Sequence, residues 1–299
     1  MILKQKRNFE ALIADTFGYV KEYAAHFFPT MLRVNAFYLI LMCVMAYFAF
    51  TLSYPDINGI SGLKINMNPG GFGFKDIMPS LNIANSQLSG MPWAIPLLMV
   101  GYLFLMAGFV VFMAFTPSYM ILQEKNSREP SFGEIVSFLK HRAGKLILYC
   151  LGILLMSIPV LVILIPTIIF LAISIVGIIL IPLVFLFIML MSSLMLYAYI
   201  SDERTGFFES MDIAWRIIRR SFWKTMIANG LIYIVTAALA WFPRSFASAF
   251  ANINTPGLVF LGVLFAFFSL LLHFVISAFY NVNVGLIYFS SETDRKGFS

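Results

Sequence analysis

The stretch LILYCLGILLMSIPVLVILIPTIIFLAISIVGIILIPLVFLFIMLMSSLMLYAYIS runs from Leu146 to Ser201, and its 56 residues include no Asp, Glu, Lys or Arg. As one helix it would be about 84 Å long, whereas the core of a bilayer is about 30 Å thick. The stretch must therefore fold back on itself. Pro166 and Gly177 lie near its middle and favour a break there. The sequence predicts two transmembrane helices, over about 146–170 and 174–200, joined by a tight apolar turn.

Apolar stretches of similar character lie on both sides of this region. They cover about 35–54, 93–119, 225–243 and 257–290, and a polar turn is expected between Pro243 and Pro256. The whole chain is 61% apolar and 11% charged, whereas soluble domains are about 25% charged. Its own core could not bury that much apolar surface. We therefore expect an all-α integral membrane protein with six transmembrane helices.

The basic residues predict how the spans are oriented. With six spans, 17 of the 20 Lys and Arg residues fall on one side, and only Lys64, Lys75 and Arg244 fall on the other. Basic residues accumulate in cytoplasmic loops, so both termini and the 291–299 tail are expected in the cytoplasm. No cleavable signal peptide follows the basic residues at the N-terminus. The predicted location is a bacterial cytoplasmic (inner) membrane, and no nucleic-acid partner is expected because the chain shows no nucleic-acid-binding module.

Three cytoplasmic segments read as amphipathic helices with a period near 3.6 residues. They cover 1–33, about 131–143 and about 205–223. The apolar stripe of the first consists of Phe9, Leu12, Ile13, Thr16, Phe17, Val20, Ala24 and Phe27. The second stripe is Phe132, Ile135, Val136, Leu139 and Ala143, and the third is Phe207, Phe208, Met211, Trp215, Ile218 and Phe222. Each helix precedes a pair of spans, which predicts three repeats of an interfacial helix plus a helical hairpin.

The third amphipathic segment supplies candidate contacts with lipid headgroups. Aromatic side chains at a membrane surface bury their rings while nearby cations face anionic lipid. The candidates are Trp215, Arg216, Arg219, Arg220, Trp223 and Lys224. Two alternatives stay open: the three helices pack together as a cytoplasmic collar, or amphipathicity only reflects a loop that enters a membrane.

Residues 209–224, ESMDIAWRIIRRSFWK, carry a resemblance to a known family. With the apolar hairpin before it and a span directly after it, this segment resembles the membrane domain fused to some glycerophosphodiester phosphodiesterases and found alone in related bacterial membrane proteins. The resemblance covers roughly residues 120–290. It implies a multi-helix membrane module, and it does not bring phosphodiesterase activity, because the catalytic domain is absent from this sequence.

Candidate polar sites are few, and we predict no catalytic residues, no metal site and no cofactor. No Asp, Glu, Lys or Arg lies inside a proposed span, although such residues usually mark ion or proton pathways. Intramembrane polar contacts are expected from Asn229, His273, Asn281 and Asn283. The outer loop over 55–92 is longer than a hairpin needs, and its Phe72 and Phe74 are candidates for contact with a periplasmic partner.

Three classes of function are compatible with these features. The first is a non-catalytic scaffold or assembly partner in the membrane, bound to lipids and to a membrane or periplasmic protein. The second is translocation of a lipid or small amphiphile, because Pro159, Pro166 and Pro182 could open the helix backbones toward a groove. The third is a lipid-acting membrane enzyme, for which Glu209 or Asp212 would have to be essential.

Overall fold

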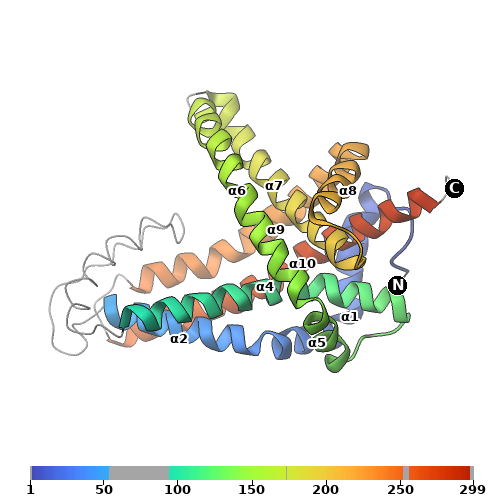
Figure 1. Cartoon of the computed structure of the whole chain (residues 1–299). Helices are drawn as coiled ribbons and strands as arrows, with labels where there is room; N and C mark the ends of the chain where they lie inside the picture. The colour runs from blue at the N-terminus through green and yellow to red at the C-terminus, as the bar shows by residue number, and fades with distance from the viewer. Residues whose placement is uncertain (1, 54–93, 173, 252–255, 297–299) are drawn as a thin grey trace. The chain divides into compact units, whose positions relative to one another are not determined.

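The computed structural model describes residues 2–53, 94–172, 174–251 and 256–296, and the regular elements in these ranges are all α-helices (Figure 1). In chain order they are α1 (Phe9–Val34), α2 (Ala36–Ser53), α4 (Ala94–Asn126), α5 (Phe132–His141), α6 (Ala143–Ala172), α7 (Ile175–Ser201), α8 (Phe207–Arg220), α9 (Phe222–Ala251) and α10 (Pro256–Lys296).

Five of these helices are long and apolar enough to cross a membrane. The apolar segments are Val100–Asn126, Ala143–Leu171, Leu180–Ser201, Phe222–Pro243 and Phe267–Glu292. A sixth span is present if the consecutive helices α1 and α2 are taken together as one broken span. This helical content confirms the all-α prediction and fits a multi-pass membrane protein.

The chain divides into two compact units. Unit 1 comprises residues 1–34, 110–236 and 276–299, and unit 2 comprises residues 35–109 and 237–275. The boundaries pass through α4, α9 and α10, so each of these helices contributes to both units. Every polar cluster described below lies in unit 1.

The core of unit 1 is rich in aromatic side chains. Phe27 on α1 packs edge-on against Phe115 and Tyr119 of α4, with ring centroids 5.3 and 5.0 Å apart. Tyr197 on α7 stacks on Tyr288 of α10 at 5.8 Å. A Cβ added to Gly285 would lie 2.5 Å from a sulfur and 2.6 Å from a phenol oxygen of this core, so α10 can pack this closely only with glycine at that position.

The start of α5 is set by a capping box. The backbone N–H of Glu134 donates to the side chain of Ser131 at 3.3 Å, and the backbone N–H of Ser131 donates to the Glu134 carboxylate at 2.7 Å. Ser127, just after α4, has a φ of 53°, the left-handed conformation that commonly ends a helix. These local features separate α5 from α4.

Helices α6 and α7 form the hairpin that the apolar stretch predicts. Ser174 caps α7 by accepting the backbone N–H of Gly177 at 2.9 Å. A Cβ on Gly177 would lie 1.8 Å from the carbonyl oxygen of Leu171, so the tight turn requires glycine there. The prolines inside α6 and α7 do not end either helix: α6 runs through Pro159 and Pro166, and α7 runs through Pro182.

One predicted turn begins later than the sequence suggests. We expected the fifth span to end at Pro243, but α9 continues to Ala251, and α10 begins at Pro256. Apolar helices tolerate an internal proline when neighbouring helices and side-chain hydroxyls satisfy the freed backbone groups. Pro243 leaves the carbonyl of Leu239 without its helical N–H donor, and α9 continues through this position for about two more turns.

Unit 2 is an apolar body held by aromatic contacts. Phe37 of α2 meets Phe104 of α4 edge-on at 6.0 Å, and Tyr38 lies 6.0 Å from Phe274 of α10. A Cβ on Gly108 would come within 2.6 Å of the Tyr38 ring, so glycine permits the close approach of α4 to α2.

Candidate functional site

The outer face of α8 carries aromatic and basic side chains together. Phe208 on α8 and Trp223, at the start of α9, are 69% and 71% exposed, and Trp215 of α8 is half exposed while its ring forms a T-shaped pair with Phe187 of α7. Arg216 and Arg219 are exposed on α8, and Arg216 pairs with Asp212 at 2.9 Å. This combination of tryptophan and arginine is typical of a helix at the boundary between water and lipid.

The apolar stripe predicted for this segment divides between two faces. Ser210, Ala214, Ile217 and Ile218 are buried against the rest of unit 1, whereas Phe208, Trp215 and Phe222 are exposed. The prediction placed Ile218 with the exposed aromatic residues. Periodicity marks all apolar positions of a helix as one stripe. It does not show which of them are buried against the protein and which are exposed.

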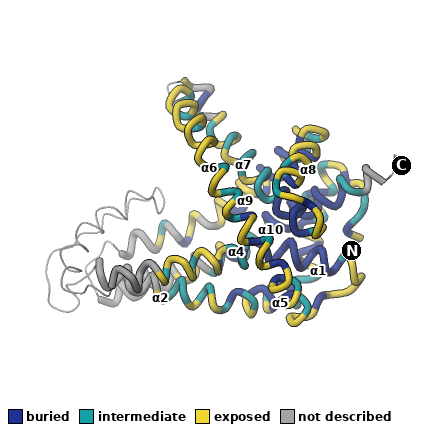
Figure 2. Tube along the Cα trace, in the orientation of Figure 1, coloured by how far each residue is buried: buried dark blue, intermediate teal, exposed yellow. Residues whose placement is uncertain are grey.

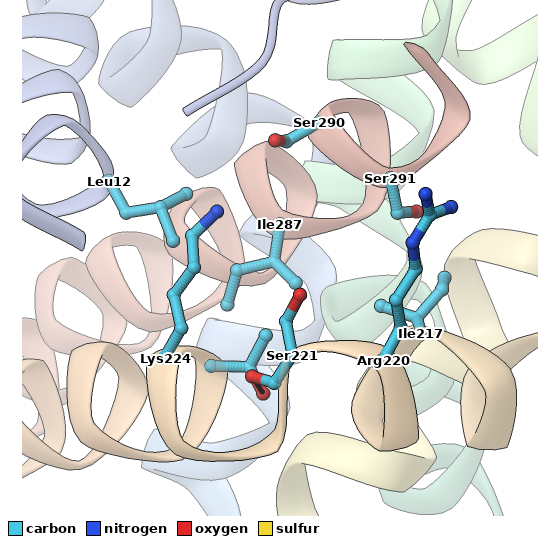
Figure 3. Close-up of a pocket in the computed structure, with 9 residues that line it drawn as sticks. Leu12, Ile217, Arg220, Ser221, Lys224, Ile287, Ser290 and Ser291 are labelled. Atoms are coloured by element: carbon cyan, nitrogen blue, oxygen red, sulfur yellow. Dashed lines mark hydrogen bonds between the residues drawn. The ribbon is translucent and has the colours of Figure 1, made fainter. Parts of the chain in front are cut away.

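Two of the predicted headgroup contacts extend toward α10, where Lys224 is half-buried and Arg220 stays exposed. Figure 3 shows Arg220 and Lys224 extending from α8 and α9 toward the end of α10, on either side of Ser221. They line a polar cavity of about 30 Å³ that also includes Ser290. The Lys224 Nζ atom donates to the backbone carbonyl of Arg7. The cavity has room for water, but it is too small for a lipid headgroup.

Arg7 is the most deeply buried charged side chain in the described ranges, at 1% exposure. Its Nε atom donates to the Asp15 carboxylate at 2.7 Å. Its Nη atoms donate to the carbonyls of Ile2, Leu3 and Gln5 at 2.7, 2.6 and 3.3 Å. The backbone N–H of Arg7 donates to the hydroxyl of Ser290 at 3.1 Å. These bonds fasten residues 2–8, called the N-terminal segment below, to α1 and α10 within unit 1.

A second ionic cluster holds the same segment. Lys4 contacts Glu124 of α4 at 2.7 Å and Glu292 of α10 at 3.2 Å. Partial burial, the largest single influence, lowers the pKa of Lys4, but its hydrogen bonds and charge attraction to the two carboxylates together raise it above its ordinary value. The amine therefore remains charged at neutral pH.

The predicted intramembrane amides take part in hydrogen bonds inside unit 1. The hydroxyl of Thr16 donates to the Oδ1 atom of Asn283 at 3.2 Å, and the Asn283 amide donates to Asn229 at 3.2 Å. The Asn229 amide donates in turn to the Tyr280 hydroxyl at 3.3 Å. The Asn281 amide donates to the carbonyl of Ser277 at 2.9 Å, and its backbone carbonyl accepts the Tyr197 hydroxyl at 2.7 Å. This chain of bonds joins α1, α9 and α10.

The remaining predicted residues lie elsewhere. His273 is exposed on the part of α10 that belongs to unit 2. Phe72 and Phe74, proposed for a partner contact, lie outside the described residues. Within the described ranges, no group of three or more His, Cys, Asp or Glu residues is placed to hold a metal ion.

The roles of Arg7 and Arg142 were not predicted. Arg142 follows α5 and is 9% exposed. In the sequence, each appeared only as one more cytoplasmic charge within a basic cluster. No signal in the sequence separates Arg142 from Lys140 and Lys145, which flank it at the start of the same apolar span.

Comparison with known proteins gives no match among family models, curated proteins or solved structures. The resemblance of residues 120–290 to the membrane domain of glycerophosphodiester phosphodiesterases therefore stays a prediction.

Proposed function

We propose that this chain is a six-span protein with both termini in the cytoplasm, and that it acts as a non-catalytic scaffold or assembly partner for another membrane protein. The order of the helices supports a threefold repeat. The amphipathic helices α1, α5 and α8 each precede a pair of apolar helices: α2 and α4, α6 and α7, and α9 and α10.

The observation that carries the proposal is the exposure of α6. None of the 18 residues in the most apolar segment of α6 is buried inside the protein. In the corresponding 18-residue segments of the other four candidate spans, 33–65% of the residues are buried. Figure 2 shows α6 as largely exposed along its length. Its outward side chains include Leu151, Leu155, Ile158, Val162 and Ile169.

A helix with this much apolar surface can pack against a helix of another membrane protein. Lipid tails are as apolar as Leu, Ile and Val, so association of transmembrane helices depends on van der Waals packing, and a partner of α6 must fit the shape of this surface better than lipid does. The hairpin keeps this surface in place because α7, on the other side of α6, packs against α8 as well. We therefore assign the lateral contact of the scaffold to α6.

Translocation of lipid remains the alternative, and the geometry favours it less. It would use helix backbones opened at proline, whereas Pro159, Pro166 and Pro182 lie inside continuous helices. A lipid-acting enzyme would need Glu209 or Asp212. The Glu209 carboxylate accepts the backbone N–H of Gly206 at 3.4 Å, and Asp212 pairs with Arg216, so both side chains have structural contacts.

The test is site-specific photocrosslinking in native membranes. A photoreactive side chain at Leu155, which faces outward, should give one discrete protein adduct, and the same protein should be recovered in stoichiometric amount after mild solubilisation. The matched control is the same side chain at the half-buried Ile153, two residues away. Only lipid adducts at Leu155, together with purification of the chain alone, would reject the scaffold function. Accelerated lipid flip in liposomes containing the pure protein would then establish the alternative.

The six-span arrangement has its own test in reporter fusions. Fusions that end at Asn126 and Ser201 should place the reporter in the cytoplasm, and a fusion at Ser53 should place it outside. A reporter at Ser53 and a reporter at Asn126 on the same side would reject the proposed topology.

A further inference from the structure

A hollow of about 440 Å³ lies in unit 1 beside α5, between the end of α4 and the link from α7 to α8. Its lining combines positive charge, a hydroxyl and an aromatic ring. The residues that matter are Lys125, Ser137, Phe138, His141, Arg142 and Glu203. The hollow is far larger than the 30 Å³ cavity between α8 and α10, and it can hold a group of several heavy atoms.

Arg142 is the unusual member of this lining. Its guanidinium lies over the ring of Phe138, with Cζ 4.5 Å from the ring centre, and its Nη2 atom is 3.7 Å from the Glu203 carboxylate. That distance is too long for a hydrogen bond. The Nη1 atom is buried and has no hydrogen-bond partner among the described residues.

Comparison with Arg7 shows what Arg142 lacks. Both side chains are at least nine-tenths buried, but the Arg7 guanidinium donates to one carboxylate and three backbone carbonyls. Burying a guanidinium is costly unless acceptors replace the lost water. Burial also lowers the pKa of Arg142, with Glu203 and Asp202 opposing that effect. Arg142 therefore has a buried donor without an acceptor among the described residues, and a rotation of the side chain that turns Nη1 into the hollow would let an anion there accept from it.

The neighbours of Arg142 define the chemistry of that acceptor. Lys125 adds an exposed ammonium, and Ser137 adds a hydroxyl. Helix α5 ends at His141 and α6 begins at Ala143, so the negative end of one helix dipole and the positive end of the other meet at Arg142, and the side chains carry the preference for an anion. A phosphate group, with several oxygens of delocalised negative charge, matches this set of donors better than a carboxylate does.

Two carboxylates also line the hollow, and neither prevents an anion from binding. Glu134 already accepts from Arg128 at 2.5 Å and from the backbone of Ser131. Glu203 is 65% exposed and is held only loosely, at 3.6 Å from His141 and 3.7 Å from Arg142. It can move aside, or it can receive the ammonium of a zwitterionic headgroup.

We propose that this hollow binds the phosphate of a phospholipid headgroup, with Arg142 as the main donor and Lys125 as the second cation. The apolar helix α6 starts directly beside Arg142, and its first outward residues, Ile147, Leu148 and Leu151, are exposed. An acyl chain can lie along them while the headgroup occupies the hollow. This site goes beyond the proposed scaffold function and does not depend on it.

The test uses the full chain in an uncharged maltoside detergent. Thermal unfolding is followed while dihexanoyl phosphatidylglycerol or inorganic phosphate is added. The wild type should be stabilised by the lipid with saturation, and Arg142→Gln should weaken the apparent affinity by about tenfold or more, because hydrogen bonds to a charged partner are lost. Lys140→Gln is the matched control, since it removes the same charge from an exposed position on α5 outside the hollow.

The outcomes separate the sources of the phosphate and the ways the proposal can fail. Saturable binding of the lipid and not of inorganic phosphate supports a headgroup site as proposed, whereas binding of inorganic phosphate alone overturns the lipid assignment. No saturable stabilisation, or equal losses in Arg142→Gln and Lys140→Gln, overturns the site. If Arg142→Gln does not fold, Lys125→Gln replaces it in the test. Lys125→Gln must then weaken lipid binding severalfold, while Lys140→Gln must not.

Discussion

Substituting Arg7 by methionine should release the N-terminal segment, residues 2–8, from its contacts with the rest of unit 1. Methionine keeps much of the length of the side chain but has no donors. The change would leave three backbone carbonyls and the carboxylate of Asp15 without the guanidinium that they share. The backbone bonds from Arg7 to Ser290 and Lys224, and the ion pairs of Lys4 with Glu124 and Glu292, would then have to hold the segment without the guanidinium.

The size of the effect follows from the burial of these groups. Breaking a buried ion pair by removing one partner costs about 3–5 kcal/mol. The Asp15 side chain is 27% exposed and can regain some water, so the lower end, about 3 kcal/mol, applies. Since each 1.4 kcal/mol changes an equilibrium about tenfold, the population with residues 2–8 undocked should rise about 100-fold.

Hydrogen exchange of N-terminal peptides, read by mass spectrometry, measures that population directly. Peptides covering residues 2–8 should exchange about 100 times faster in Arg7→Met, while peptides from α7 keep the wild-type rate. Lys21→Met is the matched control, because Lys21 is an exposed cation on α1. Wild-type exchange over residues 2–8 in Arg7→Met would refute the reasoning, since the buried fork would then contribute nothing to docking.

Four further predictions concern capping, pH dependence, packing and buried hydrogen bonds. Ser131→Ala should destabilise α5 by about 1 kcal/mol and speed its hydrogen exchange. The backbone hydrogen bond from Ser131 holds the pKa of Glu134 below its ordinary 4.5, so the contribution of Glu134 to stability is present above pH 4.5 and should be lost as the pH falls below it. Gly285→Ala should cost about 1–3 kcal/mol of folding stability and lower the thermal midpoint. The control Gly18→Ala, with no atom within 4 Å of the new methyl, should not lower it. Equal midpoints for the two variants would contradict the packing described for α10. Asn283→Leu should cost about 1–3 kcal/mol in a denaturation assay, because it leaves buried hydrogen-bonding groups unpaired.

The apolar hairpin was the most predictable part of the fold. Its composition and length leave no alternative to two antiparallel helices; α6 ends at Ala172 and α7 begins at Ile175, within two residues of the predicted bounds at 170 and 174. The end of α9 was less predictable, because proline is a strong stop signal in soluble helices and a weak one in apolar helices. The position of such a boundary depends on what the neighbouring helices supply.

The candidate sites were predicted by residue type but not by direction. Trp215 and Arg216 are exposed as a membrane-surface helix requires, whereas Lys224 turns inward to a backbone carbonyl. Counting charges on loops could not separate Arg7 and Arg142 from exposed cations. Their difference lies in acceptors contributed by residues far apart in sequence, such as Ser290 for the backbone of Arg7.

These contacts also distinguish α1 from α8, which look alike as sequences. The buried Thr16 of α1 is bonded to Asn283 of α10, and Leu12 and Tyr19 are buried with it, so α1 is part of the packed body of unit 1. Helix α8 buries one face and leaves a row of aromatic and basic side chains outside. Amphipathic period predicts that a helix has two faces, but it does not say whether the apolar face packs against protein or is left exposed. The contacts of α1 bury Leu12, Thr16, Val20 and Phe27 of its predicted stripe inside unit 1, whereas α8 leaves Phe208 and Trp215 of its stripe exposed.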